Sequence, residues 1–194
     1  MSVRKKRTLV IRDPKMVRAL RTPLRREILE ALIRLRSSSV KDLGAEIGRT
    51  PAALYYHVHE LARVGLIRET EKRGGGKRRQ SMYEPVAGRI VIDRTVRTGP
   101  FIGALADLQR STLRTAEREL ARALESAQRA GVPRADAASL IRSTARLKLK
   151  AAKQAQKKLR DLAQFIAEND DPSAAGTYAV TAALVPLKRR SRRE

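Results

Sequence analysis

The chain has 194 residues, of which 42% are hydrophobic and 3% aromatic, enough for one aliphatic core or two small ones. It carries 43 Lys and Arg against 20 Asp and Glu, and this formal net charge of +23 favours a polyanionic partner. The absence of cysteine excludes disulfides, cysteine-ligated metals and thiol catalysis. No signal peptide and no apolar run of about 18 residues is evident, so we expect a cytoplasmic protein without a membrane partner.

The first third of the chain predicts a basic arm and three short helices. Residues 1–12 form the arm, and Asp13-Pro14 predicts a helix that ends near residue 21. Thr22-Pro23 predicts a second helix, with the threonine hydroxyl as N-cap and proline at the first helical position. Its apolar residues recur at helical spacing. They are Leu24, Ile28, Ala31, Leu32 and Leu35. Three serines at 37–39 end this helix and cap the next, over residues 40–47.

The segment 51–64 predicts a helix with one apolar and one polar face. Leu54, Val58 and Leu61 share the apolar face, with His57 and Ala62 on its flanks. The outer face and the N-terminal end carry small, aromatic and basic residues suited to base edges and phosphates in a DNA major groove. These residues are Thr50, Ala52, Ala53, Tyr55, Tyr56, His59 and Arg63. A solvated outer helix of a plain three-helix core is the alternative interpretation.

A basic, glycine-rich hairpin follows this helix. Residues 66–73 and 77–85 predict two strands, joined by a turn at Gly74-Gly75-Gly76. The cations beside the turn suit DNA phosphates, which contribute affinity rather than sequence readout. They are Lys72, Arg73, Lys77, Arg78 and Arg79. The spacing is not that of a nucleotide-binding P-loop. Three helices and a hairpin are the order of a winged helix-turn-helix.

The C-terminal half predicts a long antiparallel helical hairpin. A third strand is predicted at 89–96, helices at 101–130 and 134–168 with a break at Gly131-Val132-Pro133, and a last strand at 178–185 that could pair with the third. The Ala- and Leu-rich stripes of the two helices favour a homodimer, although they could instead pack on the chain's own winged domain. An effector is possible between the helices, but no polar group identifies it.

The sequence therefore predicts a mainly α, α+β protein. We expect a basic arm at 1–12, a winged helix-turn-helix domain at 13–98, a helical dimerisation or effector region with a terminal strand at 99–186, and a basic tail at 187–194. The basic clusters at 4–7 and 188–193 are either solvated tails or DNA contacts.

The residues from Thr50 to Ile67, TPAALYYHVHELARVGLI, resemble the recognition helix of ArsR-like winged-helix transcriptional regulators. Residues 24–32 and 40–47 resemble the two helices before it, and the resemblance covers about residues 13–95. It implies a winged helix-turn-helix fold, DNA binding, and a wing that reaches the minor groove or adjacent phosphates. Metal-sensing members place cysteine ligands in the helix corresponding to residues 40–47, and this chain has none, so metal sensing is not implied.

The leading hypothesis is thus a dimeric, sequence-specific transcriptional regulator that binds double-stranded DNA. An architectural, nucleoid-type protein with little sequence preference is the second, and an RNA-associated module the third. We expect no enzyme, cofactor or metal site. The two histidines, His57 and His59, diverge by about 200° on a helix, and no catalytic triad or carboxylate pair is apparent.

Overall fold

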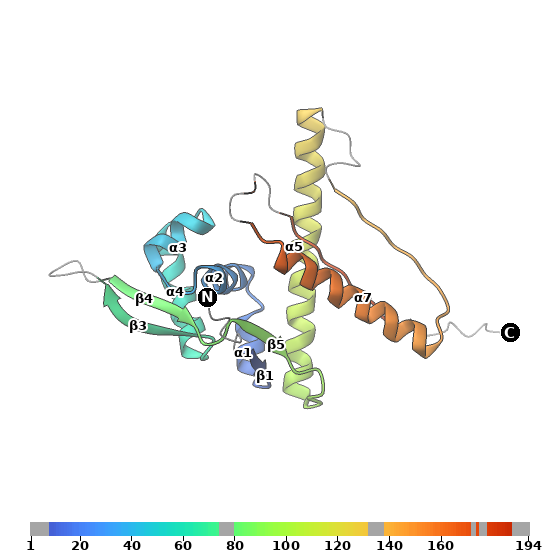
Figure 1. The fold of residues 1–194 in the computed structure, drawn as a ribbon, viewed down its shortest axis with the longest axis horizontal. Coiled ribbons are helices and arrows are strands. Elements are labelled where there is room, and N and C mark those ends of the chain that lie inside the picture. The colour runs from blue at the N-terminus through green and yellow to red at the C-terminus, as the bar shows by residue number, and fades with distance from the viewer. Residues whose placement is uncertain (1–7, 74–79, 132–137, 172–173, 175–177, 188–194) are drawn as a thin grey trace. The chain divides into compact units, whose positions relative to one another are not determined.

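The computed structural model describes residues 8–73, 80–131, 138–171, 174 and 178–187, with only the backbone for 71–73 (Figure 1). The chain divides into two compact units, residues 1–115 and 116–194. The basic clusters at 4–7 and 188–193, and Lys77, Arg78 and Arg79 of the predicted wing, lie outside the described residues. No helix within the described ranges is long and apolar enough to cross a membrane.

Four helices of the first unit begin where the sequence predicts them. They are α1 (Pro14–Ala19), α2 (Pro23–Leu35), α3 (Val40–Ile47) and α4 (Pro51–Arg63). Asp13 caps α1 by accepting a hydrogen bond from the backbone N–H of Lys15 at 2.7 Å, and Ser39 caps α3 in the same way. Thr22 and Thr50 occupy N-cap positions but make no side-chain cap hydrogen bond, so the predicted hydroxyl cap at Thr22 is wrong. Proline at the first helical position favours the start of α2 and of α4 in the absence of a side-chain cap hydrogen bond.

The turn between α3 and α4 depends on two glycines. Gly48 has φ of +69°, in the left-handed region, and ends α3. The backbone N–H of Arg49 donates to the carbonyl of Gly44 at 2.9 Å, and a Cβ at Gly44 would lie 2.6 Å from the carbonyl oxygen of Arg49. Only glycine fits this close approach, which brings α4 across α3.

The predicted hairpin is confirmed and belongs to a three-stranded sheet. β3 (Ile67–Arg73) and β4 (Gln80–Pro85) pair antiparallel, with Ile67 opposite Pro85. A short strand that the sequence analysis missed, β2 (Ser38–Ser39), pairs with β4, so the strand order is β2-β4-β3. The serines between α2 and α3 thus tie the helices to the wing sheet, in addition to capping α3.

A second sheet joins the N-terminus to the end of the winged region. β1 (Thr8–Ile11) pairs in parallel with β5 (Arg89–Ile92), Ile11 lying opposite Ile92. Arg12 donates to the carboxylate of Asp93 at 2.8 Å just beyond the paired residues. The expectation that residues 1–12 form only a basic arm is therefore wrong. The run Thr-Leu-Val-Ile is β-branched and apolar, and Ile11 is fully buried.

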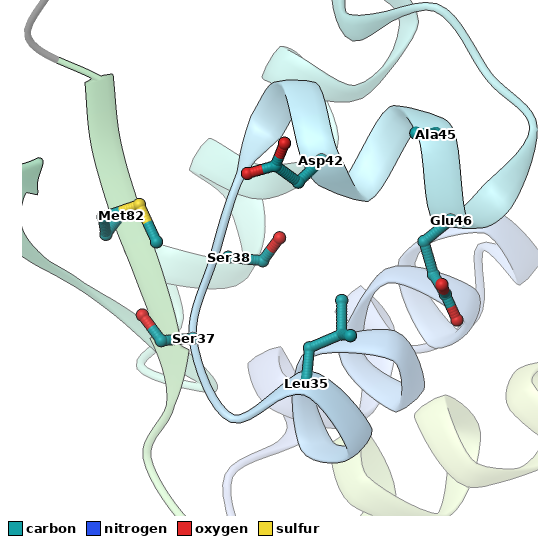
Figure 2. A pocket seen from close by; sticks show the side chains of 7 residues that line it. All are labelled: Leu35, Ser37, Ser38, Asp42, Ala45, Glu46 and Met82. Carbon is teal, nitrogen blue, oxygen red and sulfur yellow. The ribbon is translucent and has the colours of Figure 1, made fainter. Parts of the chain in front are cut away.

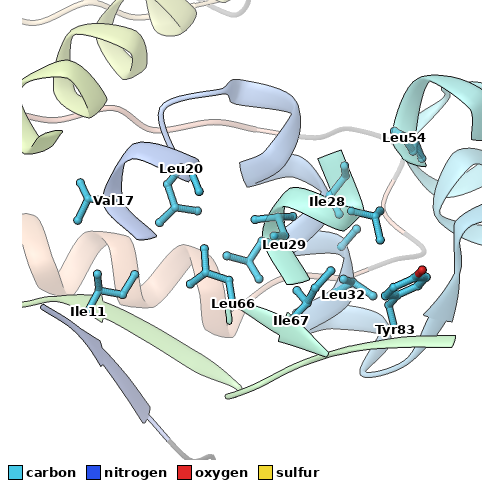
Figure 3. Packing of buried hydrophobic residues seen from close by; sticks show 14 of the residues in the cluster. Ile11, Val17, Leu20, Ile28, Leu29, Leu32, Leu54, Leu66, Ile67 and Tyr83 are labelled. Carbon is cyan, nitrogen blue, oxygen red and sulfur yellow. The ribbon is translucent and has the colours of Figure 1, made fainter. Parts of the chain in front are cut away.

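The core of the first unit takes side chains from α1, α2, α4 and the strands (Figure 3). The start of α5 (Gly99–Ala130) belongs to it as well, because Phe101, Ala104 and Leu108 are buried in the same cluster. The division between the two compact units falls at 115/116, after the first turns of α5.

The second unit differs from the predicted hairpin. Its second helix, α7 (Leu149–Glu168), begins well after the predicted start at 134, and residues 138–148 have no helical structure. Ser139, Ser143 and Thr144 are weak helix formers, but most other residues of this stretch are good ones, so local propensity does not account for the late start. Residues 178–185 form no strand, and β5 pairs with β1 instead. The side chains of Tyr178 and Val185 are exposed, so nothing buries an apolar face of this segment.

Phe101→Ala tests whether α5 is part of the first core. The Phe101 side chain has no exposed surface, whereas 49% of its neighbour Ile102 is exposed. We expect Phe101→Ala to lower the free energy of unfolding by about 3–5 kcal/mol and Ile102→Ala by about 1 kcal/mol or less, measured by urea denaturation of the full chain. Equal effects of the two variants would contradict the packing of α5.

Asp93 should make the stability of the β1–β5 pair dependent on pH. Hydrogen bonds from Arg12 and Thr95 lower its pKa from 3.8 to about 2. Because the pKa is lower in the folded chain, ionised Asp93 stabilises the fold above the unfolded value, and this contribution is lost as the pH falls through about 2. Asp93→Asn should lower the urea midpoint at neutral pH, and its difference from the native chain should shrink in acid. Asp161→Asn on α7 is the control, and a difference for Asp93→Asn that stays constant with pH would contradict the assignment.

Candidate nucleic-acid interface

Helix α4 has one buried and one exposed face, in the predicted phase. Leu54, Val58 and Leu61 have no exposed surface and pack in the core of the first unit. They recur every three or four residues, so the positions on the opposite side of the helix face outward. The predicted division of this helix into an inner and an outer face is confirmed.

The outer face of α4 gathers the residues that the sequence analysis assigned to DNA contact. Tyr55 and Tyr56 are 52% and 64% exposed. The other predicted residues of this face and its N-terminal end are exposed as well, namely Thr50, Ala52, Ala53, His59 and Arg63. Two exposed tyrosines beside small residues form a surface with flat apolar rings, hydroxyl groups and room for close approach. Such a surface suits the edges of base pairs.

His57 lies at the border between the two faces. Its Nδ1 is buried and has no hydrogen-bond partner among the described residues, and its ring contacts that of Tyr56 edge to face at 5.3 Å between centroids. Burial and the nearby charge of Arg25 lower the pKa of His57 below its usual value of 6.5. A neutral imidazole at the core edge is the role that fits this geometry.

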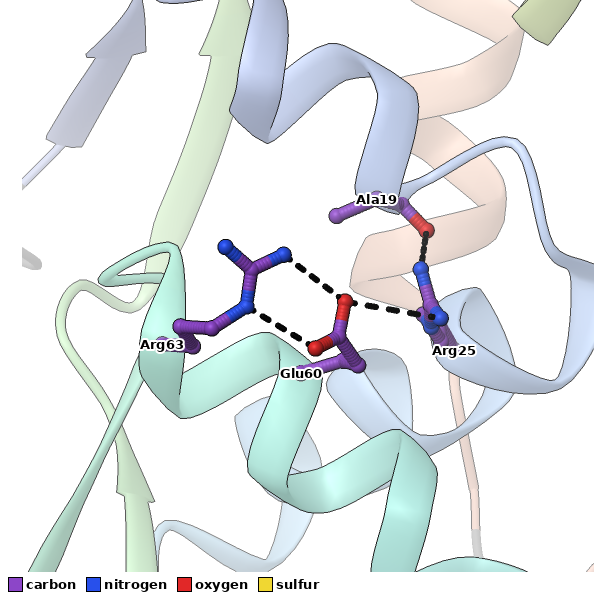
Figure 4. A network of polar contacts seen from close by, with 4 residues as sticks. All are labelled: Ala19, Arg25, Glu60 and Arg63. Atoms are coloured by element: carbon purple, nitrogen blue, oxygen red, sulfur yellow. Dashed lines mark hydrogen bonds and ion pairs between the residues drawn. The ribbon is translucent and has the colours of Figure 1, made fainter.

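Arg63 is exposed, but its guanidinium already has a partner on the same helix (Figure 4). Nε and Nη2 donate to the two carboxylate oxygens of Glu60 at 2.8 and 2.9 Å. This pairing lowers the pKa of Glu60 and raises the pKa of Arg63. The predicted DNA contact by Arg63 thus starts from a bidentate ion pair, which the sequence analysis did not anticipate.

Arg25 of α2 is a residue of this site that the sequence analysis missed. Only 11% of its side chain is exposed, and its guanidinium lies 3.8 Å from Glu60 and 5.5 Å from the ring centre of Tyr56. It also donates to the carbonyl of Ala19 at the end of α1, at 3.4 Å. Arg25 therefore connects α1, α2 and α4 directly beneath the exposed face. The sequence does not indicate this role of Arg25, because a helical wheel drawn from Leu24 and Ile28 places Arg25 on the flank of α2.

Only part of the predicted wing lies within the described residues. β3 carries Lys72 and Arg73 toward the end of the hairpin, where the backbone alone is described. Opposite each other on the two strands, Arg68 and Glu84 form an ion pair at 3.1 Å. The two strands therefore extend toward the segment in which the predicted basic cluster lies.

An open depression beside α3 is a second candidate site (Figure 2). Its lining residues come from α2, α3 and the β2–β4 pair. They are Leu35, Ser37, Ser38, Asp42, Ala45, Glu46 and Met82. Asp42 accepts from the hydroxyl of Ser39 at 2.8 Å and Glu46 pairs with Arg34 at 2.9 Å, so both carboxylates have partners. Across the described residues, no three His, Asp or Glu side chains are grouped to hold a metal ion.

The central part of the first unit is similar to a known domain family. Residues 20–70 match the family model of a helix-turn-helix domain. The structure of a transcriptional regulator homologue from Pyrococcus horikoshii OT3 matches 51% of this chain and 85% of its own, with 18% identity and a TM-score of 0.31. No curated protein matches the chain. Residues 20–70, which span α2, α3 and α4, are thus similar to a helix-turn-helix domain.

Paired alanine variants separate the two faces of α4. Leu54→Ala should lower the free energy of unfolding by about 2–5 kcal/mol, because it removes fully buried methyl groups. Tyr56→Ala should lower it by about 1 kcal/mol or less, because it removes an exposed ring and its contact with Arg25. Urea denaturation of the two full-length variants measures both. A larger loss for Tyr56→Ala would show that the aromatic face is structural.

Proposed function

We propose that the chain is a dimeric, sequence-specific transcriptional regulator of the winged helix-turn-helix type, similar to ArsR-like proteins and without enzymatic activity. Helix α4 enters the major groove of double-stranded DNA, and Tyr55, Tyr56 and His59 reach the base edges. The small residues Ala52 and Ala53 allow the close approach, and Thr50 and Arg63 lie within reach of the backbone. The basic wing contacts the adjacent minor groove or its phosphates through Lys72, Arg73, Lys77, Arg78 and Arg79.

The observation that carries this proposal is the outer face of α4 within a helix-turn-helix domain. Its two tyrosines are exposed, although the chain has only four tyrosines and could bury both. The net charge of +23 supplies the long-range attraction to a polyanion. With DNA as its partner, the protein works in the cytoplasm, with the nucleoid.

One observation favours the alternative function, an architectural DNA-binding protein with little sequence preference. The formal charge of +23 exceeds what one pair of recognition helices needs, and charge alone is enough for binding without sequence preference. An RNA-associated module is less well supported. Such modules stack bases on aromatic side chains of a sheet, and Tyr83 of β4 is buried in the core.

Selection from a pool of random duplexes at physiological salt separates regulator from architectural protein. A regulator enriches one sequence, in the form of an inverted repeat if it binds as a dimer. Tyr56→Ala should then lose about 1–3 kcal/mol of discrimination between the enriched and the random duplex. Tyr178→Ala, at an exposed tyrosine of the second unit, is the matched control. Absence of any enrichment would support the architectural function.

Binding should depend strongly on salt. If a dimer neutralises about eight phosphates, the logarithm of the affinity should fall with the logarithm of the salt concentration with a slope of about −7. Reversing Arg78 and Arg79 to Glu should weaken the enriched and the random duplex alike and reduce this slope. Arg122→Glu with Arg129→Glu, in the part of α5 that belongs to the second unit, gives the same change in net charge. If both double variants behave identically, the wing makes no local contact.

The second unit supports the homodimer through apolar side chains that the described chain does not bury. No residue of α7 is buried, although Leu159, Leu162 and Ile166 share one side of this amphipathic helix. An isolated helix of 20 residues gains little stability in water unless its apolar face is packed. A second copy of the chain would cover this face and also place two α4 helices on the two halves of an inverted repeat. A small-molecule effector stays open, because no polar group identifies one.

Light scattering of the full chain at moderate salt should give twice the mass of one chain. Leu162→Glu should produce monomers, because it places a carboxylate in the apolar stripe of α7, and Gln164→Glu on the opposite side should leave the dimer intact. A native chain that is monomeric, or a Leu162→Glu variant that still dimerises, would place the interface elsewhere.

A further inference from the structure

The carboxylate of Glu60 lies between two arginines of different accessibility. Arg25 is largely buried, whereas 65% of the Arg63 side chain is exposed. Both oxygens of Glu60 accept from Arg63, and one of them also lies 3.8 Å from Nη2 of Arg25 (Figure 4). The Glu60 carboxylate thus pairs with the buried Arg25 on one side. On the other side it binds the accessible guanidinium of Arg63, on the outer face of α4.

A DNA phosphate and the Glu60 carboxylate would bind Arg63 in the same way. Both are anions that accept two parallel hydrogen bonds from a guanidinium. Arg63 can therefore reach a phosphate only by giving up Glu60, and the free energy of the existing pair is subtracted from the new contact. Because Arg25 also pairs with Glu60, the carboxylate cannot simply follow Arg63 toward the DNA.

We propose that Glu60 is a specificity-determining residue of α4, because it competes with DNA phosphates for the guanidinium of Arg63. This inference rests on the proposed DNA-binding function. Non-specific complexes are held by phosphate contacts, and the protein shifts along the duplex until its cations find phosphates. A released Arg63 would strengthen such complexes most. In a specific complex, base contacts fix the position of α4, so a released Arg63 gains less.

The test uses full-length variants and two duplexes, one random and one enriched from the pool by the native chain. Glu60→Gln keeps the shape of the side chain and removes its charge. It should raise affinity for the random duplex about two- to five-fold, the range expected for loss of an exposed ion pair, and raise affinity for the enriched duplex less. Asp107→Asn is the matched control, because Asp107 pairs with Arg110 at the same spacing on α5.

Two further variants separate competition from simple charge repulsion. In an Arg63→Gln background, Glu60→Gln should raise affinity for the random duplex no more than Asp107→Asn does. Glu60→Asp keeps the negative charge beside Arg25 but shortens its reach to Arg63, and it should still raise affinity for the random duplex. This variant also carries the test if Glu60→Gln proves too unstable to measure.

Two results would overturn the inference. One is an unchanged or lower affinity of the folded Glu60→Gln and Glu60→Asp variants for the random duplex. The other is a gain that persists in full without Arg63. If the native chain enriches no sequence, the proposed function fails, and the random-duplex measurements still decide whether Glu60 restrains Arg63.

Discussion

The guanidinium of Arg25 is the interaction on which the geometry of the helix-turn-helix depends. Burial of an arginine is costly unless other groups replace its water, and Arg25 meets the carbonyl of Ala19, the carboxylate of Glu60 and the ring of Tyr56, while its Nε has no hydrogen-bond partner among the described residues. These groups belong to α1 and α4, so a shift of either helix would leave a charge without its partners. The neighbouring Arg26 and Ser111 donate to the carbonyls of Leu20 and Arg21, which fixes the same turn against α5.

This constraint has a direct consequence for the outer face of α4. Leu54, Val58 and Leu61 pack α4 against the core, and Arg25 of α2 pairs with Glu60 on the same helix. The ring of Tyr56 is 64% exposed and lies over the buried guanidinium, which supports one face of the ring. A side chain restrained before binding loses less conformational entropy on contact with a partner. The features that stabilise the domain therefore also preorganise its candidate contact surface.

The amphipathic helices, the hairpin and the exposed positions of α4 could be predicted from the sequence because each follows a local period. Leu54, Val58 and Leu61 recur at helical spacing, and the glycines at 74–76 separate two strand-like stretches. What could not be predicted depends on partners distant in sequence. Thr8–Ile11 is a strand because it pairs with residues 89–92, and Ser38–Ser39 is a strand because it pairs with β4. Arg25 acquires its role from Glu60 and Tyr56 on another helix, and the late start of α7 has no local sequence signal.

The parallel pairing of β1 with β5 also bears on how the domain folds. Each residue of β1 meets a partner 81 positions later in the chain, whereas the contacts among α2, α3 and α4 are local by comparison. Closing so long a loop costs entropy before any strand contact offsets it, so pairings of this kind form late on the folding pathway. The helix-turn-helix can therefore assemble first and β1 join it afterwards. A nascent chain would hold its β1 segment unpaired until Arg89–Ile92 has left the ribosome.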